Sequence, residues 1–236
     1  MKNRNETQKI IAAVFLLAIL SVASGAKSDA QTTFSKILLT WQATTYAPAA
    51  FEGKVLPGPG SAIYASADVI QNGKLVDMSR EQIYWYLDDE FLDGGLGKQT
   101  ISFEVPLAAP DFAFLSVQLP DYTGHGGSLF TNSVRIPIAR PETVIESPYP
   151  ENKFSGTQVR IFGEPYFFNV SKISDLNFLW SVNGKNPPGS ESPTELVINI
   201  NTDAPAKSQV GVSLLIQDPK DLVSSASDIL SLILVK

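Results

Sequence analysis

One histidine, His125, is the only imidazole that this chain of 236 residues could bring to catalysis. It lies in the stretch Tyr122–Gly127, which is rich in glycine and typical of a loop. A Ser-His-Asp triad would have to use this residue, and no Gly-x-Ser-x-Gly or Ser-x-x-Lys motif with its partner motifs supplies a nucleophile. The chain has no cysteine, so thiolate ligands and thiol nucleophiles are excluded. We expect His125 to be a solvent-exposed loop residue.

Carboxylates form the second candidate for chemistry. Asp88, Asp89, Glu90 and Asp93 follow one another closely, and two acids roughly 5 to 10 Å apart could hydrolyse a glycosidic bond. A catalytic acid needs a raised pKa, which a narrow solvated turn does not provide. Calcium would need about six to eight oxygens, and the chain has no Asp-x-Asp-x-Asp-Gly loop. We therefore predict no catalytic residue, no metal ligand and no cofactor, and expect the chain not to be an enzyme.

Two tyrosines are the best candidates for a binding site. Trp85 and its alternate neighbours are apolar and are expected to point inward, so Tyr84 and Tyr86 should lie on the outer face of the same strand. Outward tyrosines can anchor a protein interface or stack on a sugar ring. The long loop Ala47–Gly60 could also cover them. Tyr84 and Tyr86 are our predicted partner-binding residues.

The segment that carries these tyrosines occurs twice. Ile83–Glu90 is echoed 95 residues later by Phe178–Lys185, and both copies contain Trp-x-[Leu/Val]-[Asp/Asn]-[Asp/Gly]. Matching spacing over a long stretch predicts two copies of one β-module of about 100 residues. In a two-layer sandwich a large aromatic residue fills the space between the sheets. Trp85 and Trp180 are therefore predicted to be the core aromatics of the two modules.

Short segments of alternating polarity are separated by turn residues every 8 to 12 positions, a rhythm typical of antiparallel sandwiches. The predicted strands of the first module are Phe34–Trp41, Ile63–Ile70, Gln82–Leu87, Thr100–Val105, Phe112–Leu119 and Asn132–Ile138. Those of the second are Glu142–Ile145, Gln158–Phe162, Tyr166–Val170, Asn177–Val182, Glu195–Ile200, Gln209–Gln217 and Ile229–Val235. The expected fold is all-β, with two tandem antiparallel β-sandwich domains at residues 34–140 and 141–236.

The N-terminus predicts export. Within residues 1–26, three basic residues precede the apolar stretch Ile10–Val22, and small residues follow, which is the order of a secretory signal. The alternative is an uncleaved membrane anchor, since the stretch is near the short limit for a spanning helix. Residues 27–33 are expected to be a short polar linker. The formal net charge of −6, with no cluster of basic residues, argues against nucleic-acid binding.

The motif around each tryptophan resembles that of bacterial Ig-like modules, including the PKD-like group. The resemblance covers residues 34–236, and it departs from the PKD-like pattern at the glycine- and aspartate-rich turn of those modules. The segments Leu38–Trp41, Trp85–Asp89 and Pro165–Val170 are also similar to uncharacterised exported proteins of small-genome candidate-phylum bacteria. The resemblance implies an Ig-like fold and a location outside the cytoplasm, but no activity.

We therefore expect a non-enzymatic, exported envelope protein with a structural, adhesive or protein-interaction role. Its expected partners are other envelope or surface proteins, and it should meet the membrane only through an uncleaved N-terminal segment. The alternative is a carbohydrate-binding β-sandwich protein that uses the exposed aromatics of the first domain on a glycan. A hydrolase or a periplasmic assembly factor is a further rival.

Overall fold

The computed structural model describes residues 34–125, 129–187, 192–201 and 203–235. The expected signal segment and linker, residues 1–33, lie outside the described residues. Within the described part, regular structure consists of strands and three short 3-10 turns, and no helix there has the length and apolar character needed to cross a membrane. The fold is therefore all-β, as the sequence predicts.

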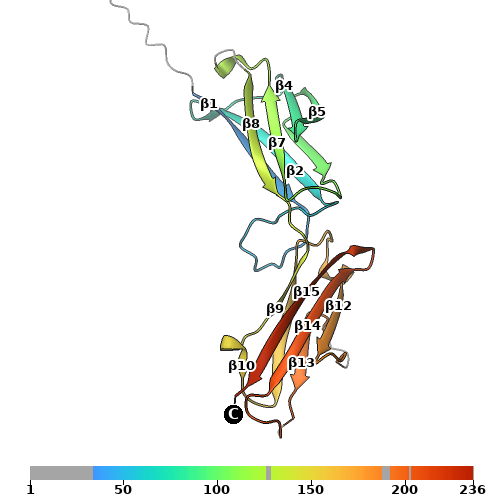
Figure 1. Cartoon of the computed structure of the whole chain (residues 1–236). Coiled ribbons are helices and arrows are strands. Elements are labelled where there is room, and N and C mark those ends of the chain that lie inside the picture. Colours follow the sequence, from blue (N-terminus) through green and yellow to red (C-terminus); the bar gives the residue numbers. More distant parts are fainter. Residues whose placement is uncertain (1–33, 126–128, 188–191, 202, 236) are drawn as a thin grey trace, which may run out of the picture. The chain divides into compact units, whose positions relative to one another are not determined.

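Strands β1 to β8 make up the first module (Figure 1). Their bounds are β1 Ser35–Ala43, β2 Ala62–Gln71, β3 Lys74–Leu75, β4 Gln82–Leu87, β5 Glu90–Leu96, β6 Thr100–Glu104, β7 Phe112–Leu119 and β8 Phe130–Pro137. One sheet has the order β1-β2-β3, with β6 also paired to β2, and the other has the order β5-β4-β7-β8. All these pairs are antiparallel. The buried faces of the two sheets form one hydrophobic core.

Strands β9 to β15 make up the second module. Their bounds are β9 Glu142–Glu146, β10 Lys153–Phe154, β11 Gln158–Tyr166, β12 Asn177–Val182, β13 Glu195–Asn199, β14 Gln209–Asp218 and β15 Asp221–Leu234. One sheet has the order β13-β11-β9 and the other β10-β15-β14-β12, where only the short β10–β15 pair is parallel. A second, separate hydrophobic core lies between these sheets.

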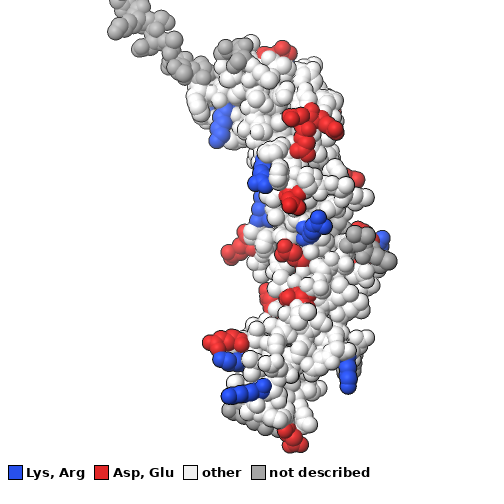
Figure 2. All heavy atoms as spheres, in the orientation of Figure 1, with Lys and Arg blue, Asp and Glu red and all other residues white. Residues whose placement is uncertain are grey.

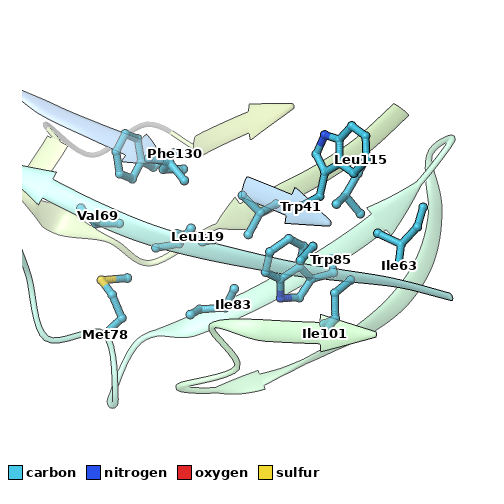
Figure 3. Packing of buried hydrophobic residues seen from close by; sticks show 14 of the residues in the cluster. Trp41, Ile63, Val69, Met78, Ile83, Trp85, Ile101, Leu115, Leu119 and Phe130 are labelled. Carbon is cyan, nitrogen blue, oxygen red and sulfur yellow. The ribbon is translucent and has the colours of Figure 1, made fainter. Parts of the chain in front are cut away.

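Trp85 lies at the centre of the first core, where its side chain is 0% exposed (Figure 3). The view shows the indole among side chains from both sheets, including Ile63 and Ile101 from one and Leu115 from the other. Its Nε1–H donates to the carbonyl oxygen of Lys98 at 2.8 Å. The indole thus fills the space between the layers and satisfies its one polar group there.

Trp180 repeats this arrangement in the second core. It is 7% exposed, and its Nε1–H donates at 2.9 Å to the carbonyl oxygen of Pro193. In both modules the acceptor lies 13 residues after the tryptophan. The pairing is repeated as well, since Trp85 faces Val117 on β7 and Trp180 faces Leu214 on β14. The sequence repeat is therefore a structural repeat down to single hydrogen bonds.

Two predicted segments differ in the structure. The predicted strand Tyr166–Val170 is wrong: β11 continues to Tyr166, and the chain then turns at Phe167, which has a φ of 61° that ends extended structure. Phe168 is buried in the second core outside any strand. The predicted strand Ile229–Val235 begins earlier, at Asp221, because β15 pairs with β14 along almost its whole length.

Strand β5 is absent from the predicted set. The sequence indicates a turn at Asp88-Asp89, and both residues do have positive φ, 48° and 68°. The chain then returns along β4 with a bulge between Trp85 and Tyr86. The extra strand extends the sheet beyond β4 and supplies part of the candidate site.

Candidate functional site

Tyr84 and Tyr86 lie on the outer face of the β5-β4-β7-β8 sheet. Their neighbours Ile83 and Trp85 are 1% and 0% exposed, so alternation turns both tyrosines away from the core. Both tyrosines are half-buried. Across the β4–β7 pair, Tyr84 faces Gln118 and Tyr86 faces Ser116.

Phe91 on β5 covers part of both rings. It faces Tyr86 across the β4–β5 pair, and its ring centroid lies 5.8 Å from that of Tyr86 and 6.1 Å from that of Tyr84. Both contacts are edge-to-face, at 74° and 67°. Gly94 leaves room for this arrangement, because a Cβ at that position would collide with the Tyr84 ring. Phe91 itself remains 60% exposed.

A second aromatic pair lies on β7 of the same face. Phe112 and Phe114 are in edge-to-face contact, with centroids 5.5 Å apart, and Phe114 is 47% exposed. Arg135 on β8 faces Phe114 in the pairing register and places its guanidinium 4.0 Å from the centroid of the Phe112 ring. Such a cation–π contact holds the arginine against the aromatic surface.

We call this group the aromatic face, defined by Tyr84, Tyr86, Phe91, Phe112, Phe114 and Arg135. Aromatic residues and arginine are the residue types that protein interfaces favour. The sequence predicted the two tyrosines only. The other members could have been found from alternation, since inward Leu115 requires outward Phe114, and from the Asp88-Asp89 turn, which sets Phe91 opposite Tyr86.

The loop Ala47–Gly60 packs against Tyr166 and Trp41. Its Phe51 ring packs edge-to-face on Tyr166, with centroids 5.6 Å apart. Just before the loop, Tyr46 exchanges two backbone hydrogen bonds with residues 167 and 168, at 2.7 and 2.8 Å. Against the rings of Tyr84 and Tyr86 lie Phe91 and, for Tyr84, Gly94, both from β5.

The acidic residues near this face have structural roles. Asp88 donates its backbone N–H to the carbonyl of Phe114 and accepts the Phe114 N–H with Oδ1, at 2.9 and 2.8 Å. Asp93 forms a 2.8 Å ion pair with Lys98. The hydrogen bond from Lys98, together with that from the Gly94 N–H, lowers the pKa of Asp93. A lowered pKa is the opposite of what a general acid needs.

Glu164 on β11 is the one described carboxyl group whose pKa is clearly raised. Burial is the larger cause of the raised pKa, and the negative charge of the nearby Glu146 is the second cause. The pKa of Tyr166 is also raised, by burial and by both glutamates. Glu146 and Glu164 lie near each other because β9 and β11 are paired, with Glu146 facing Phe162. The described residues contain no group of three or more side chains of the types that ligate metals placed to hold an ion.

His125 is not a fully exposed loop residue. It ends a short 3-10 turn, is half-buried, and stacks on Phe130 with ring centroids 4.4 Å apart. The ring of Tyr122 also stacks on Phe130, with ring centroids 5.1 Å apart. The imidazole therefore acts as a packing element next to the first core.

Surface charge is mixed on the face shown in Figure 2, where acidic and basic side chains are interspersed and no continuous basic stripe is visible. A phosphate backbone would need such a stripe. A hollow of about 780 Å³ is lined by residues of β12, β13, β14 and β15 and by Asn186, Pro187 and Pro193. Its members include Leu179, Leu215 and Ile229, and no charged residue lines it.

No protein-family model matches the sequence, and no curated protein matches it. Among solved structures, the chain is similar to the fibronectin(III)-like modules of Clostridium thermocellum CbhA, with 13% identity over 84% of this chain and 94% of that one and a TM-score of 0.28. It is also similar to three N-terminal domains of the highly immunogenic outer capsid protein of bacteriophage RB49, with 14% identity over 85% of this chain and 59% of that one and a TM-score of 0.41.

A third similar structure is SGBP-B of the Bacteroides ovatus mixed-linkage glucan utilization locus, in complex with a heptasaccharide. Here the identity is 10% over 83% of this chain and 47% of that one, with a TM-score of 0.25. This chain thus spans less than two thirds of the length of the phage and Bacteroides structures. The strand order, antiparallel pairing and core tryptophans of the chain itself define two tandem Ig-like β-sandwiches.

Proposed function

We propose that this chain is a non-enzymatic interaction protein of the cell envelope, which binds a protein partner through the aromatic face of its first module. Export rests on the N-terminal segment 1–26, whose charge and polarity follow the order of a secretory signal. The proposed domains are residues 34–140 and 141–236, which follow that segment and the linker 27–33.

The observation that carries the proposal is the position of Phe91. It holds two tyrosine rings edge-to-face while 60% of its own side chain stays exposed. A core-forming ring would be buried, whereas this ring is fixed in place and faces solvent. Aromatic side chains that are already ordered lose little conformational entropy on binding, which is why they dominate interface energetics.

A protein partner fits the ring geometry better than a glycan. A sugar stacks on the open flat side of a ring, while here Tyr84 and Tyr86 turn toward the same phenyl ring at steep angles of 67° and 74°. One side of Phe112 is occupied by Arg135. The face therefore offers ring edges, an exposed phenyl and a guanidinium, which suit side chains and carbonyl groups of a protein. The carbohydrate-binding alternative remains an outcome of the test.

The absence of catalysis is supported by what the carboxylates already do. Asp88 closes a turn and Asp93 pairs with Lys98, so neither is poised as a proton donor. Glu164 has a raised pKa but lies on a sheet surface beside Glu146. The contacts of Asp88 and Asp93 thus account for these two acids without a reaction.

The test compares Phe91→Ala with Leu75→Ala. Both residues are exposed and apolar, at 60% and 72%, and Leu75 lies on β3 of the other sheet. Tagged full-length protein is used to recover partners from envelope extract of the native cells. We expect Phe91→Ala to weaken capture of a protein partner about tenfold or more, as for a residue central to an interface, and Leu75→Ala to capture as the unmodified chain does.

The double variant Tyr84→Ala/Tyr86→Ala should give the same loss, with the fold checked by circular dichroism. Unchanged recovery of every protein by all three variants would overturn the proposal. Recovery of a polysaccharide that is lost with Phe91→Ala, without any protein, would support the carbohydrate alternative instead.

A further inference from the structure

The connection between β1 and β2 is long for two strands that pair directly. Its central part, the loop Ala47–Gly60, contains no strand. The two ends of the connection lie close together, because Ala43 faces Ile63 where β1 and β2 pair. Compact loops of about 6 to 16 residues with neighbouring ends are frequently functional, and loops near the upper end of that range seldom occur without a role. The length of the loop therefore calls for a role beyond joining two strands.

Buried hydrogen bonds give this loop a fixed shape. Ser61, at its end, is 0% exposed. The Ser61 hydroxyl donates to the Gly58 carbonyl at 2.7 Å and accepts the Gly58 N–H at 3.0 Å. Just before the loop, the hydroxyl of buried Thr45 donates to the Leu56 carbonyl at 2.6 Å. Buried polar groups that are satisfied in this way rigidify the backbone around them.

The loop contacts the linker between the modules, residues 138–141. The Pro57 carbonyl accepts the Ala139 N–H at 2.8 Å. A Cβ at Gly58 would lie 3.3 Å from the carbonyl oxygen of Ala139 and 3.3 Å from that of Phe167 in the second module. The absence of a side chain at Gly58 thus lets the backbones of the loop, the linker and the second module approach one another closely.

Hydrogen bonds join both ends of the loop to the second module. At the start, the Tyr46 N–H donates to the Phe168 carbonyl at 2.8 Å, and the Tyr46 carbonyl accepts the Phe167 N–H at 2.7 Å. At the end, the Gly60 carbonyl accepts a hydrogen bond from the Asn169 side-chain amide at 2.9 Å. The residues of the second module that take part follow β11 directly, where the chain leaves the sheet.

Phe167 indicates that the second module is shaped for this contact. Its φ of 61° lies in a region that a bulky aromatic residue rarely adopts, yet it is only 8% exposed. The Phe51 ring of the loop packs edge-to-face on Phe167 and on Tyr166, with centroids 5.9 and 5.6 Å apart. A strained backbone persists where surrounding contacts impose it. Phe51 and Tyr46 of the first module supply such contacts.

We propose that residues 46–60, which we call the strap, lock the two modules into one rigid unit. Relative motion is the default for modules that are joined only by a linker. The strap removes this freedom, because it joins a second segment of the first module to the second module and to the linker. Both modules accordingly belong to one compact unit, Ser35–Lys236. The strap involves no member of the aromatic face, so this inference does not depend on the proposed function.

Double electron–electron resonance tests the proposal by measuring the distance between one spin label on each module. The chain has no cysteine, so labels attach only where a cysteine is introduced. Leu75→Cys and Ile229→Cys place the labels in the full chain at side chains that are 72% and 78% exposed. We expect this chain, with the strap intact, to give one narrow distance distribution. A broad distribution would overturn the proposal.

Two variants release the strap. Gly58→Val forces a branched side chain against two carbonyl oxygens, and Phe51→Ala/Asn169→Ala removes the ring and amide contacts. Each should widen the distribution about twofold or more, because the linker alone then sets the distance. In the matched control, Pro141→Gly, the linker loses its stiffest residue while the strap stays, so the distribution should remain narrow.

Narrow distributions from both strap variants would overturn the proposal. A broad distribution from Pro141→Gly would overturn it as well, because the linker and not the strap would then set the rigidity.

A second label pair separates release of the strap from loss of folding. Leu75→Cys with Ser133→Cys places both labels on exposed residues of the first module, one on each sheet. This distribution should be the same in every variant. If Gly58→Val changes it, Phe51→Ala/Asn169→Ala decides, since these two residues belong to neither hydrophobic core. Phe91→Ala should keep the narrow distance between the modules, so failure here is separate from failure of the proposed function.

Discussion

Replacing Trp85 by Phe should destabilise the first module and leave the second unchanged. Trp85 is 0% exposed and belongs to the first hydrophobic core, which shares no buried residue with the second. Phenylalanine keeps an aromatic ring between the sheets, so the module should still fold. The substitution removes the second ring of the indole and its Nε1–H group.

The size of the effect follows from these two losses. The Nε1–H donates to the Lys98 carbonyl at 2.8 Å, and removal of one partner of a buried hydrogen bond costs about 1 kcal/mol or somewhat more. The lost ring atoms leave a small cavity, which adds about 1 to 2 kcal/mol. The expected loss of unfolding free energy is thus about 2 to 3 kcal/mol, or roughly 10 to 20 °C in the melting temperature of a module of this size.

Hydrogen exchange followed by mass spectrometry separates the modules. In Trp85→Phe, amides of β7 (Phe112–Leu119) should exchange faster, while those of β14 (Gln209–Asp218) keep their rates. Trp180→Phe is the matched variant and should reverse the pattern, since its indole makes the same hydrogen bond to Pro193.

Equal acceleration in both modules would show that the two cores unfold as one unit and would refute the reasoning. A loss of unfolding free energy below about 0.5 kcal/mol in Trp85→Phe would also refute the reasoning, because a surface substitution has an effect of that size.

Two further predictions concern the second module. Burial and Glu146 raise the pKa of Glu164, so its contribution to stability is complete at pH values below the ordinary glutamate pKa and is lost as pH rises through the raised value. Glu164→Gln should therefore raise the melting temperature at pH 7 and have no effect at pH 3, as a denaturation series across pH can check. Because the carboxyl group is partly exposed and solvent screens it, the gain at pH 7 should be small, about 0.5 kcal/mol at most. Gly163→Ala should cost about 1 to 3 kcal/mol, because a Cβ there collides with Leu214, whereas Gly211→Ala, whose nearest contact would be at 3.6 Å, should cost much less in the same urea titration.

The repeat and its core could be predicted because they depend on local alternation. Trp85 and Trp180 stand in segments where every second residue is apolar, and such a pattern determines which face is buried regardless of tertiary detail. Alternation likewise predicted the outward position of Tyr84 and Tyr86. The turn at Asp88-Asp89 was predicted from residue type.

Strand β5 could not be found in the same way. Its sequence includes Asp93, Gly94 and Gly95, residues with low preference for strands, and it becomes a strand by pairing with β4. Because Phe91 comes with β5, the most exposed ring of the aromatic face was missed as well. The turn at Asp88-Asp89 was the sequence signal that could have located Phe91, because it sets which residues pair after the turn.

The strand predicted at Tyr166–Val170 was wrong for another reason. Tyr166–Val170 is rich in aromatic residues and reads as a strand. The positive φ of Phe167 sends the chain out of the sheet, and Phe168 is buried as a core residue from a loop. A buried aromatic in a loop is set by tertiary packing, which periodicity does not record.

The most direct test of the account is photo-cross-linking in the native cells from a benzoylphenylalanine placed at position 91, with position 75 as the exposed control. If the aromatic face binds a protein partner, position 91 should give a discrete cross-linked protein that is absent from position 75. A cross-link pattern that is the same from both positions, or the lack of any cross-link from position 91, would contradict it.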